Sequence, residues 1–546
     1  MKRVILLFLT SVFICLAVAC YDDKGSYDYK EVNEIEVDSL GKSHSVIFKK
    51  DTLKITPLLK FTEDSLSLDR YAYEWLVVPS TSTEELTREV IGTERNLEYF
   101  VELEPATYTL YLKVRDKVTG LLWMNYTSLV VRTATSLGWL VIGEDAEGFV
   151  NLDMVAMAGD TIVLYNQLSN NGLPRLKDPK SVVYTGRVRM SSYAPHERLW
   201  IATGERSYHV NPSTFEGDLS STFEPLVYSY FELPEQLNPV YMITKAAGGG
   251  MMNSSRTVVC EEGHVFHISS FLSSSEYADP INRTTVSPNV LFKAYPYIFA
   301  SLGYASGGIL YDTDNNQFLR YTSYSTTCSS LSDKADDAFP WVQPEGRTLV
   351  YGENTMDTEG GGYGNSFALM KDAGTNGYYI YKFKAAGQKV AGYEVNKSLA
   401  TDIDKAELFA FASNRSILLY VVGKTLHAYD YKRGYEKKYS VELEDEITMV
   451  KFDIFSGYGD YNDLYVATYN STTRGTLQKY VLGTDQNTFE LKPDEKCKWN
   501  GLVKVKDIDW KNGTLHIQRI ETRAFTQDTS TAKKKSYINN QRLLSI

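Results

Sequence analysis

The first part of the chain alternates apolar and polar positions in short runs separated by polar turns. A side-chain period of two is typical of strands with one buried face, so the pattern predicts a small antiparallel sandwich. The four clearest runs are Ser45 to Ile55, Tyr71 to Val78, Tyr108 to Val114 and Leu121 to Val131.

From Gly138 onward a unit repeats: an apolar strand, a tight polar turn and a second strand with alternating aromatic residues. The starts lie about 50 to 60 residues apart, which suits one four-stranded propeller blade each. A further hairpin, Leu502 to Ile508 and Gly513 to Ile520, would form an eighth blade or the strand that closes the ring on the first. The seven repeats begin near Trp139, Arg198, Thr257, Gly308, Asn365, Ser416 and Asp463.

Residues 1–19 have the pattern of a secretory signal peptide, with basic Lys2 and Arg3 before an apolar stretch. That stretch is about 15 residues long, shorter than the roughly 20 that a spanning helix needs. The small residues before Cys20 resemble a bacterial lipobox, although Ala17 stands where Leu is usual. The resemblance implies that the Cys20 thiol is lipidated and becomes the new N-terminus, which would anchor the chain stably.

Asp22 and Asp23 follow this cysteine almost directly. An acidic pair at this place resembles the surface-export signal of Bacteroidota lipoproteins, which implies the outer face of the outer membrane. The alternative is a solvated linker whose acids have no role.

Composition supports a globular, β-rich chain. Hydrophobic residues make up 43% and charged residues 23%, and Tyr is over-represented with 40 copies. Tyr favours strand faces and wet binding surfaces. The formal net charge of −11 argues against a nucleic-acid partner.

Beyond the leader and the lipid site, only Cys260, Cys328 and Cys497 remain. They have no paired spacing, so we expect neither a disulfide framework nor a zinc site.

One segment carries a more specific signal. Residues 105–120 resemble the late hairpin of polycystic-kidney-disease (PKD) domains, which are immunoglobulin-like sandwiches. Residues 73–77 match the strand that places a Trp in that core, so Trp75 and Tyr108 are expected to be core residues. The Gly-Asp-Gly that usually follows is replaced by residues 78–80, which marks a divergent member.

These features together resemble the PKD-like lipoproteins of Bacteroidota, whose typical opening is similar to residues 21–35. The resemblance implies an accessory role beside a starch-utilisation-type (SusC/SusD-type) outer-membrane transporter. We predict an all-β chain, an immunoglobulin-like sandwich followed by a β-propeller, with seven blades preferred and eight possible. The expected segments are 1–19 for the signal peptide, 20–34 for the lipidated N-terminus and linker, 35–135 for the sandwich and 138–546 for the propeller.

No catalytic constellation stands out in the sequence. His264 and His267 would point to opposite faces of a strand and cannot share a metal ion. Asp453 with Asp460 and Asp463 could serve a glycosidase, but solvated loop acids are the favoured interpretation. We therefore expect no catalytic residues, no metal and no cofactor.

The most ligand-like surface is an aromatic run interleaved with Asp and Gly, where rings could stack on sugars or pack on peptides. Ordinary blade packing is the alternative. The resulting hypothesis is a non-catalytic surface lipoprotein that binds a glycan or peptide or docks on the transporter. A cell-surface propeller enzyme that cleaves glycans is the second hypothesis. The aromatic residues are Phe452, Phe455, Tyr458 and Tyr461.

Overall fold

Strands dominate the part of the chain that the computed structural model describes, which confirms the predicted all-β class. The chain divides into two compact units, one built mainly from residues up to Val130 and one from Val131 onward. None of the helices in this part is long and apolar enough to cross a membrane. Cys20, Asp22 and Asp23 lie outside the described residues. The structure describes residues 33–62, 68–80, 88–186, 197–243, 255–269, 277–302, 307–322, 324–362, 364–433, 439–456 and 461–513.

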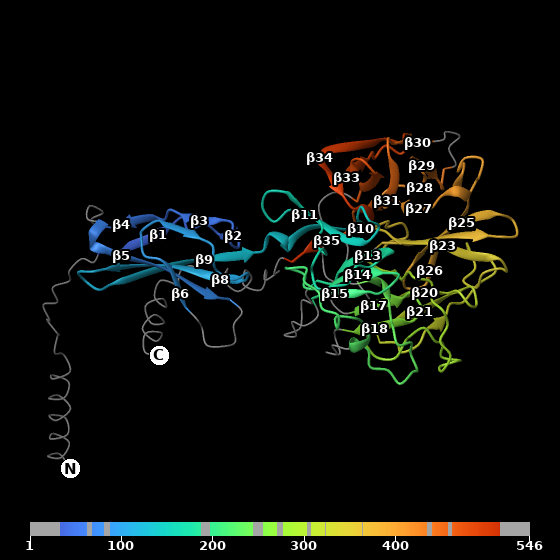
Figure 1. The fold of residues 1–546 in the computed structure, drawn as a ribbon, viewed down its shortest axis with the longest axis horizontal. Coiled ribbons are helices and arrows are strands. Elements are labelled where there is room, and N and C mark those ends of the chain that lie inside the picture. Colours follow the sequence, from blue (N-terminus) through green and yellow to red (C-terminus); the bar gives the residue numbers. More distant parts are fainter. Residues whose placement is uncertain are drawn as a thin grey trace, which may run out of the picture. The chain divides into compact units, whose positions relative to one another are not determined.

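The first unit centres on a five-stranded sheet in the order β2-β9-β8-β5-β6, and β1 pairs with β4 and β3 with β7 (Figure 1). Trp75 and its cross-strand partner Leu112 are both fully buried. Tyr108 lies in the same core, as the sequence predicted. The strands are β1 Ile35–Asp38, β2 Ser43–Ile47, β3 Thr52–Ile55, β4 Leu58–Phe61, β5 Tyr71–Pro79, β6 Glu89–Gly92, β7 Leu97–Phe100, β8 Thr107–Asp116 and β9 Leu122–Arg132.

The second unit is a β-propeller, whose described residues form seven antiparallel sheets (Figure 1). Its first three blades run, from the innermost strand outward, β35-β10-β11-β12, β13-β14-β15 and β16-β17-β18. Their strands are β10 Leu137–Glu144, β11 Val150–Ala156, β12 Ile162–Leu164, β13 Pro179–Tyr184, β14 Leu199–Thr203, β15 Tyr208–Val210, β16 Pro239–Ile243, β17 Ser255–Cys260, β18 Val265–Ser269 and β35 Lys504–Asn512.

Blades 4 to 7 each have four strands in chain order, β19 to β22, β23 to β26, β27 to β30 and β31 to β34. The seven hairpins predicted from the sequence are the second and third strands of the seven blades. The strands are β19 Phe299–Ala300, β20 Gly307–Asp312, β21 Gln317–Thr322, β22 Ser329–Ser330, β23 Arg347–Asn354, β24 Ser366–Asp372, β25 Gly377–Lys384, β26 Gln388–Glu394, β27 Leu408–Phe411, β28 Ile417–Val422, β29 Thr425–Asp430, β30 Tyr439–Glu442, β31 Glu446–Phe452, β32 Asp463–Asn470, β33 Arg474–Leu482 and β34 Leu491–Leu502.

The last described strand closes the ring. β35 pairs with β10 from Leu137 opposite Asn512 to Glu144 opposite Lys504, and it is the innermost strand of blade 1. The pairing needs glycine at position 143, because a Cβ there would lie 2.1 Å from the Lys504 carbonyl oxygen. Of the two possibilities left open for the last hairpin, ring closure is therefore correct and the eighth blade is not. The second strand predicted for that hairpin, Gly513 to Ile520, lies largely outside the described residues.

Adjacent blades pack through seven apolar clusters, one at each blade interface. The central strands send successive residues to opposite neighbours. Leu418 joins the cluster with blade 5, and Leu419 joins the cluster with blade 7. Both faces of these strands are buried, which explains why they read as continuous apolar runs rather than alternating ones.

Candidate functional site

The innermost strands of the seven blades surround a cavity of about 440 Å³, which we call the axial cavity. Its size falls within the range of small-molecule sites in proteins. Aromatic and charged side chains share its wall. The aromatic ones are Tyr241, Tyr295, Tyr297, Tyr351, Phe409, Phe452 and Phe455, and the charged ones are Lys180, Glu353, Glu407, Lys451, Lys506, Asp507 and Asp509.

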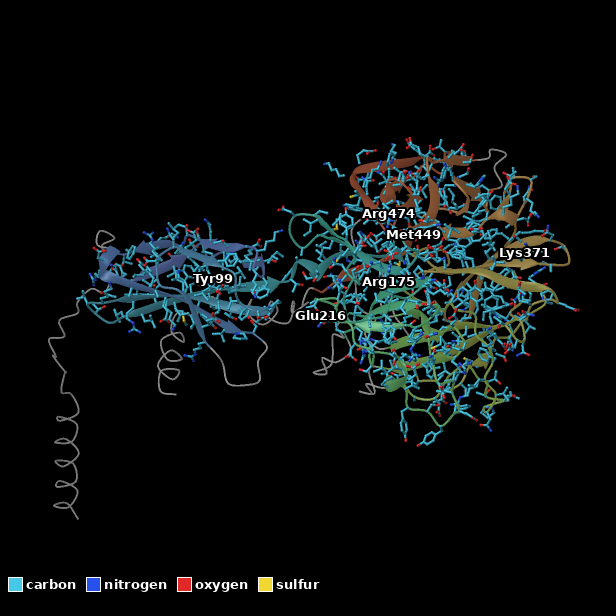
Figure 2. The ribbon with its side chains drawn as sticks, viewed as in Figure 1. Tyr99, Arg175, Glu216, Lys371, Met449 and Arg474 are labelled. Atoms are coloured by element: carbon cyan, nitrogen blue, oxygen red, sulfur yellow. The ribbon has the colours of Figure 1, made fainter. Side chains whose placement is uncertain are left out.

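Irregularities in the inner strands accompany the cavity-lining residues. The register shifts just before Ser181 in β13, Tyr241 in β16, Tyr351 in β23 and Met449 in β31, and all four residues line the cavity. Met449 is labelled in Figure 2. Because a β-bulge turns the following side chain away from its regular direction, it can bring polar groups to a wall that a regular strand would leave apolar.

An ion pair joins blade 7 to the closing strand inside this cavity. The Lys451 Nζ lies 2.7 Å from an Asp507 carboxylate oxygen and also donates to the Ile508 carbonyl oxygen at 2.8 Å. Burial alone would lower the pKa of Lys451, but the carboxylates of Asp507 and Asp509 raise it above its usual value. The lysine therefore carries its charge at neutral pH.

Carboxylates of the closing strand β35 also accept hydrogen bonds from the backbone of blade 2. The backbone N–H of Val182 donates to Asp507 at 3.3 Å, and that of Tyr184 donates to Asp509 at 2.7 Å. These bonds join residues more than three hundred positions apart, so the acids of the wall take part in closing the ring.

Glu353 is the most perturbed acid of the cavity. Burial raises the pKa of its carboxyl to about 8, although hydrogen bonds from the Phe411 N–H and the Tyr351 hydroxyl act in the opposite direction. A carboxyl group of this kind is largely protonated at neutral pH. Strongly perturbed groups in a cavity are candidates for a functional role.

Three tyrosines form an interacting group beside Glu353. The rings of Tyr241 and Tyr297 lie 4.5 Å apart between centroids, and the backbone N–H of Asn354 donates to the Tyr297 hydroxyl at 2.7 Å. Burial raises the pKa of Tyr241, Tyr297 and Tyr351. The three hydroxyls therefore stay protonated at neutral pH.

The aromatic run predicted as a ligand surface divides between several environments. Phe452 and Phe455 line the axial cavity, and Phe452 is also buried in the cluster between blades 6 and 7. Tyr461 is half-buried and lies outside the cavity lining. Tyr458 lies outside the described residues. The structure thus brings two of the four residues to one site.

The acids considered for glycosidase chemistry have local structural roles. Asp453 accepts hydrogen bonds from the N–H groups of Phe455 and Ser456, and Asp463 lies 3.4 Å from the Lys479 ammonium. Asp460 lies outside the described residues. Sequence analysis missed Glu353, Lys451 and Asp507, whose signal is a charged residue inside an apolar inner strand.

Comparison with known protein families identifies the first unit. Residues 20–171 match the model of the PKD-like family. The N-terminal domain is PKD-like. The match covers the sandwich and continues through β10, β11 and β12 of blade 1. No curated protein sequence matches the chain.

Solved structures give only weak similarities. A quinonprotein alcohol dehydrogenase-like protein from Bacteroides thetaiotaomicron is 13% identical, covering 87% of this chain and 99% of that one, with a TM-score of 0.34. The extracellular domain of a putative one-component system from the same species is 9% identical, covering 75% and 49%, with a TM-score of 0.35. YCF48 from Cyanidioschyzon merolae is 10% identical, covering 59% of this chain and 88% of that one, with a TM-score of 0.34. Similarity at this level carries no information about ligand or activity.

Proposed function

We propose that this protein is an exported, lipid-anchored binding protein that takes a glycan segment into its axial cavity. The observation that carries the proposal is the wall of that cavity. Aromatic rings lie there beside protonated tyrosine hydroxyls, a neutral carboxyl and a charged lysine. Ring faces pack against the C–H face of a sugar, and the polar groups match its hydroxyls.

Three of the four acids that line the cavity are arranged in a way that favours binding over hydrolysis. A glycosidase needs two acids placed at a set separation across the scissile bond. Asp507 pairs with Lys451, Asp509 accepts a backbone N–H, and Glu353 accepts two hydrogen bonds. Each of these three acids thus has a partner within the protein, which suits a fixed recognition wall.

Removing one ring from the wall should weaken binding without unfolding the propeller. Phe455 is half-buried and lines the cavity. We expect Phe455→Ala to raise the dissociation constant for a bound oligosaccharide by about tenfold, because one aromatic contact is worth about 1.4 kcal/mol. Isothermal titration with a panel of soluble oligosaccharides would measure the change.

The matched control is Tyr230→Ala, since Tyr230 is 86% exposed and does not line the cavity. Its affinity should equal that of the wild type. The proposal fails if no oligosaccharide binds, or if Phe455→Ala binds as tightly as the control. Binding of peptides instead would assign a different ligand class. Release of shorter sugars, lost in Glu353→Gln, would support the alternative glycan-cleaving enzyme.

Anchorage is a second part of the proposal, and it rests on the sequence around Cys20. Replacing Cys20 by Ala should leave the described strands folded and release the protein from the membrane. Changing Asp22 and Asp23 to Ala should keep the lipid and move the protein to the periplasmic face. Protease treatment of whole cells would digest the parent and spare the double variant.

A membrane-bound Cys20→Ala protein would overturn the lipid assignment, and equal digestion of the Asp22/Asp23 variant would overturn the export signal. A role beside a SusC/SusD-type transporter follows from the same resemblance. Co-purification of the transporter subunits with the full chain from detergent-solubilised membranes would test that role.

A further inference from the structure

A second cavity, of about 390 Å³, lies between blades 5 and 6, and the described residues that line it are all polar. We call it the blade 5–6 pocket. Its wall comes from the segment after β23, from β25, from the β27–β28 connection, from the turn after β29 and from one residue after β33. The residues are Asp357, Thr358, Glu359, Lys382, Ser413, Asn414, Arg415, Ser416, Tyr431, Lys432, Arg433 and Gln486.

Positive charge exceeds negative charge in this wall. Among the described residues it contains four cationic side chains, two lysines and two arginines, and two carboxylates. The whole chain has a net charge of −11, so this pocket is positive against an acidic background. A partly enclosed pocket concentrates such a local field and attracts the opposite charge.

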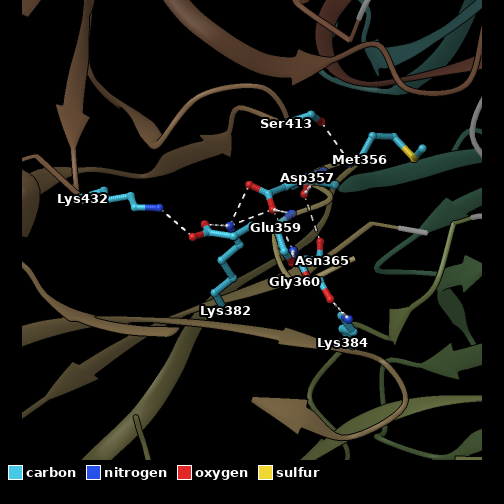
Figure 3. Close-up of polar contacts among 10 residues, drawn as sticks. Met356, Asp357, Glu359, Gly360, Asn365, Lys382, Lys384, Ser413 and Lys432 are labelled. Atoms are coloured by element: carbon cyan, nitrogen blue, oxygen red, sulfur yellow. Dashed lines mark hydrogen bonds and ion pairs between the residues drawn. The ribbon is translucent and has the colours of Figure 1, made fainter. Parts of the chain in front are cut away.

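The two lysines already neutralise both carboxylates of the wall (Figure 3). The buried ammonium of Lys382 lies 2.7 Å from Asp357 and 2.7 Å from Glu359, and the Lys432 ammonium lies 2.6 Å from Glu359. Hydrogen bonds from these lysines lower the pKa of Glu359 to about 2, so the ion pairs persist at neutral pH. Arg415 and Arg433 add two guanidinium groups to the same wall.

Local structure fixes these cations. One carboxylate oxygen of Asp430 accepts hydrogen bonds from the Ser416 hydroxyl and from the backbone N–H groups of Lys432 and Arg433. The Arg415 guanidinium donates to the Gly483 carbonyl oxygen and the Arg433 guanidinium to the Gln486 carbonyl oxygen, both at 3.0 Å. A preformed arrangement of guanidinium groups is suited to recognising the oxygens of an anion.

A buried hydroxyl supplies an independent indication. Tyr431 lines the pocket and is only 6% exposed, and among the residues that the structure describes its hydroxyl has no hydrogen-bond partner. A buried hydroxyl without a partner costs free energy, and an acceptor that enters the pocket would remove that cost. Burial raises the pKa of Tyr431 well above its usual value, so the group is a donor in need of an acceptor.

We infer that the blade 5–6 pocket binds an oxyanion, the sulfate, phosphate or carboxylate group of a small ligand. The guanidinium groups of Arg415 and Arg433 neutralise its charge, and the Tyr431 hydroxyl donates to one of its oxygens. This site is separate from the axial cavity and does not depend on the function proposed for that cavity.

The test measures the thermal midpoint of the full chain against inorganic sulfate, inorganic phosphate and acetate. Each salt is raised to about 20 mM while sodium chloride holds the ionic strength constant, so that screening does not change. A ligand that binds the native state raises the midpoint in a saturable way. Comparing the three salts distinguishes binding of a tetrahedral anion, sulfate or phosphate, from binding of the carboxylate of acetate.

We expect Lys432→Gln/Arg433→Gln to weaken anion binding by at least about tenfold, because it removes charge-assisted contacts. The matched control is Lys371→Gln/Lys405→Gln, which changes the net charge equally but outside the pocket, on blade 5 and on the connection from blade 5 to blade 6. Its response should equal that of the wild type.

Tyr431→Phe gives a second measurement that does not depend on charge. It should weaken anion binding about tenfold, and without anion its midpoint should be unchanged or higher because a buried unpaired hydroxyl is removed. The inference is overturned if none of the three anions gives a saturable response. It is also overturned if both pocket variants bind as the control does. Should the double lysine–arginine variant fail to fold, the Tyr431→Phe result alone decides.

Discussion

Ending the chain after Val503 should abolish the cooperative unfolding of the propeller, whereas ending it after Gly513 should leave it intact. The first truncation removes β35, which is the innermost strand of blade 1 and pairs along the length of β10. It also removes Val505, Ile508 and Trp510 from the cluster between blades 7 and 1. The ring would then be open at one interface, with an unpaired strand edge.

The expected loss is large. Burying a large apolar side chain stabilises a fold by about 1.5 to 3 kcal/mol, so three such residues are worth about 4.5 to 9 kcal/mol. This is comparable to the whole net stability of a typical domain, about 5 to 15 kcal/mol. Calorimetry would show a propeller transition for the chain ending at Gly513. The chain ending at Val503 should lack it and bind a hydrophobic dye. A normal transition in the shorter chain would refute the role of β35.

The central hairpins of the blades could be predicted from the sequence because their signal is local. Each combines an apolar run, a tight turn and a second apolar strand, as in Ile417–Val422 and Thr425–Asp430. The run is continuous because neighbouring blades cover both of its faces. Trp75 and Tyr108 were recognisable as core residues because residues 73–77 and 105–120 resemble strands of PKD domains.

Ring closure could not be decided in this way. β35 and β10 are more than three hundred and fifty residues apart, and an apolar strand at the end of a chain fits an extra blade equally well. Short outer and inner strands were also difficult to predict. β19 has two residues and β22 has two, which is below the length at which a period of two can be read.

The candidate site was predictable only in part, for a related reason. Phe452 and Phe455 were recognisable because several aromatic residues occur together in the sequence. Glu353, Lys451 and Asp507 come from three different blades, so nothing in the chain order indicates that they share a cavity. Single charged residues inside apolar strands were the available signal, and each alone is compatible with an ordinary solvated position.

Glu353→Gln should stabilise the protein at alkaline pH and leave its stability nearly unchanged near pH 4.5. The folded-state pKa of Glu353 is about 8, whereas the ordinary value is 4.5. Between these values the native state binds more protons than the unfolded state, so wild-type stability falls as the pH rises and levels off above about pH 8. Glutamine mimics the protonated form of Glu353, so the variant does not lose stability in this way as the pH rises.

The stability difference between variant and wild type should therefore be close to zero at pH 4.5 and grow to the order of 3 kcal/mol at pH 9. Each pKa unit corresponds to about 1.4 kcal/mol, and the partial access of solvent to the cavity reduces the full effect. Urea unfolding at several pH values would measure it. Glu407→Gln is the matched control, because Glu407 lines the same cavity but is exposed. A loss of stability in Glu353→Gln at pH 9 would mean that Glu353 is ionised and stabilised by the neighbouring Lys451.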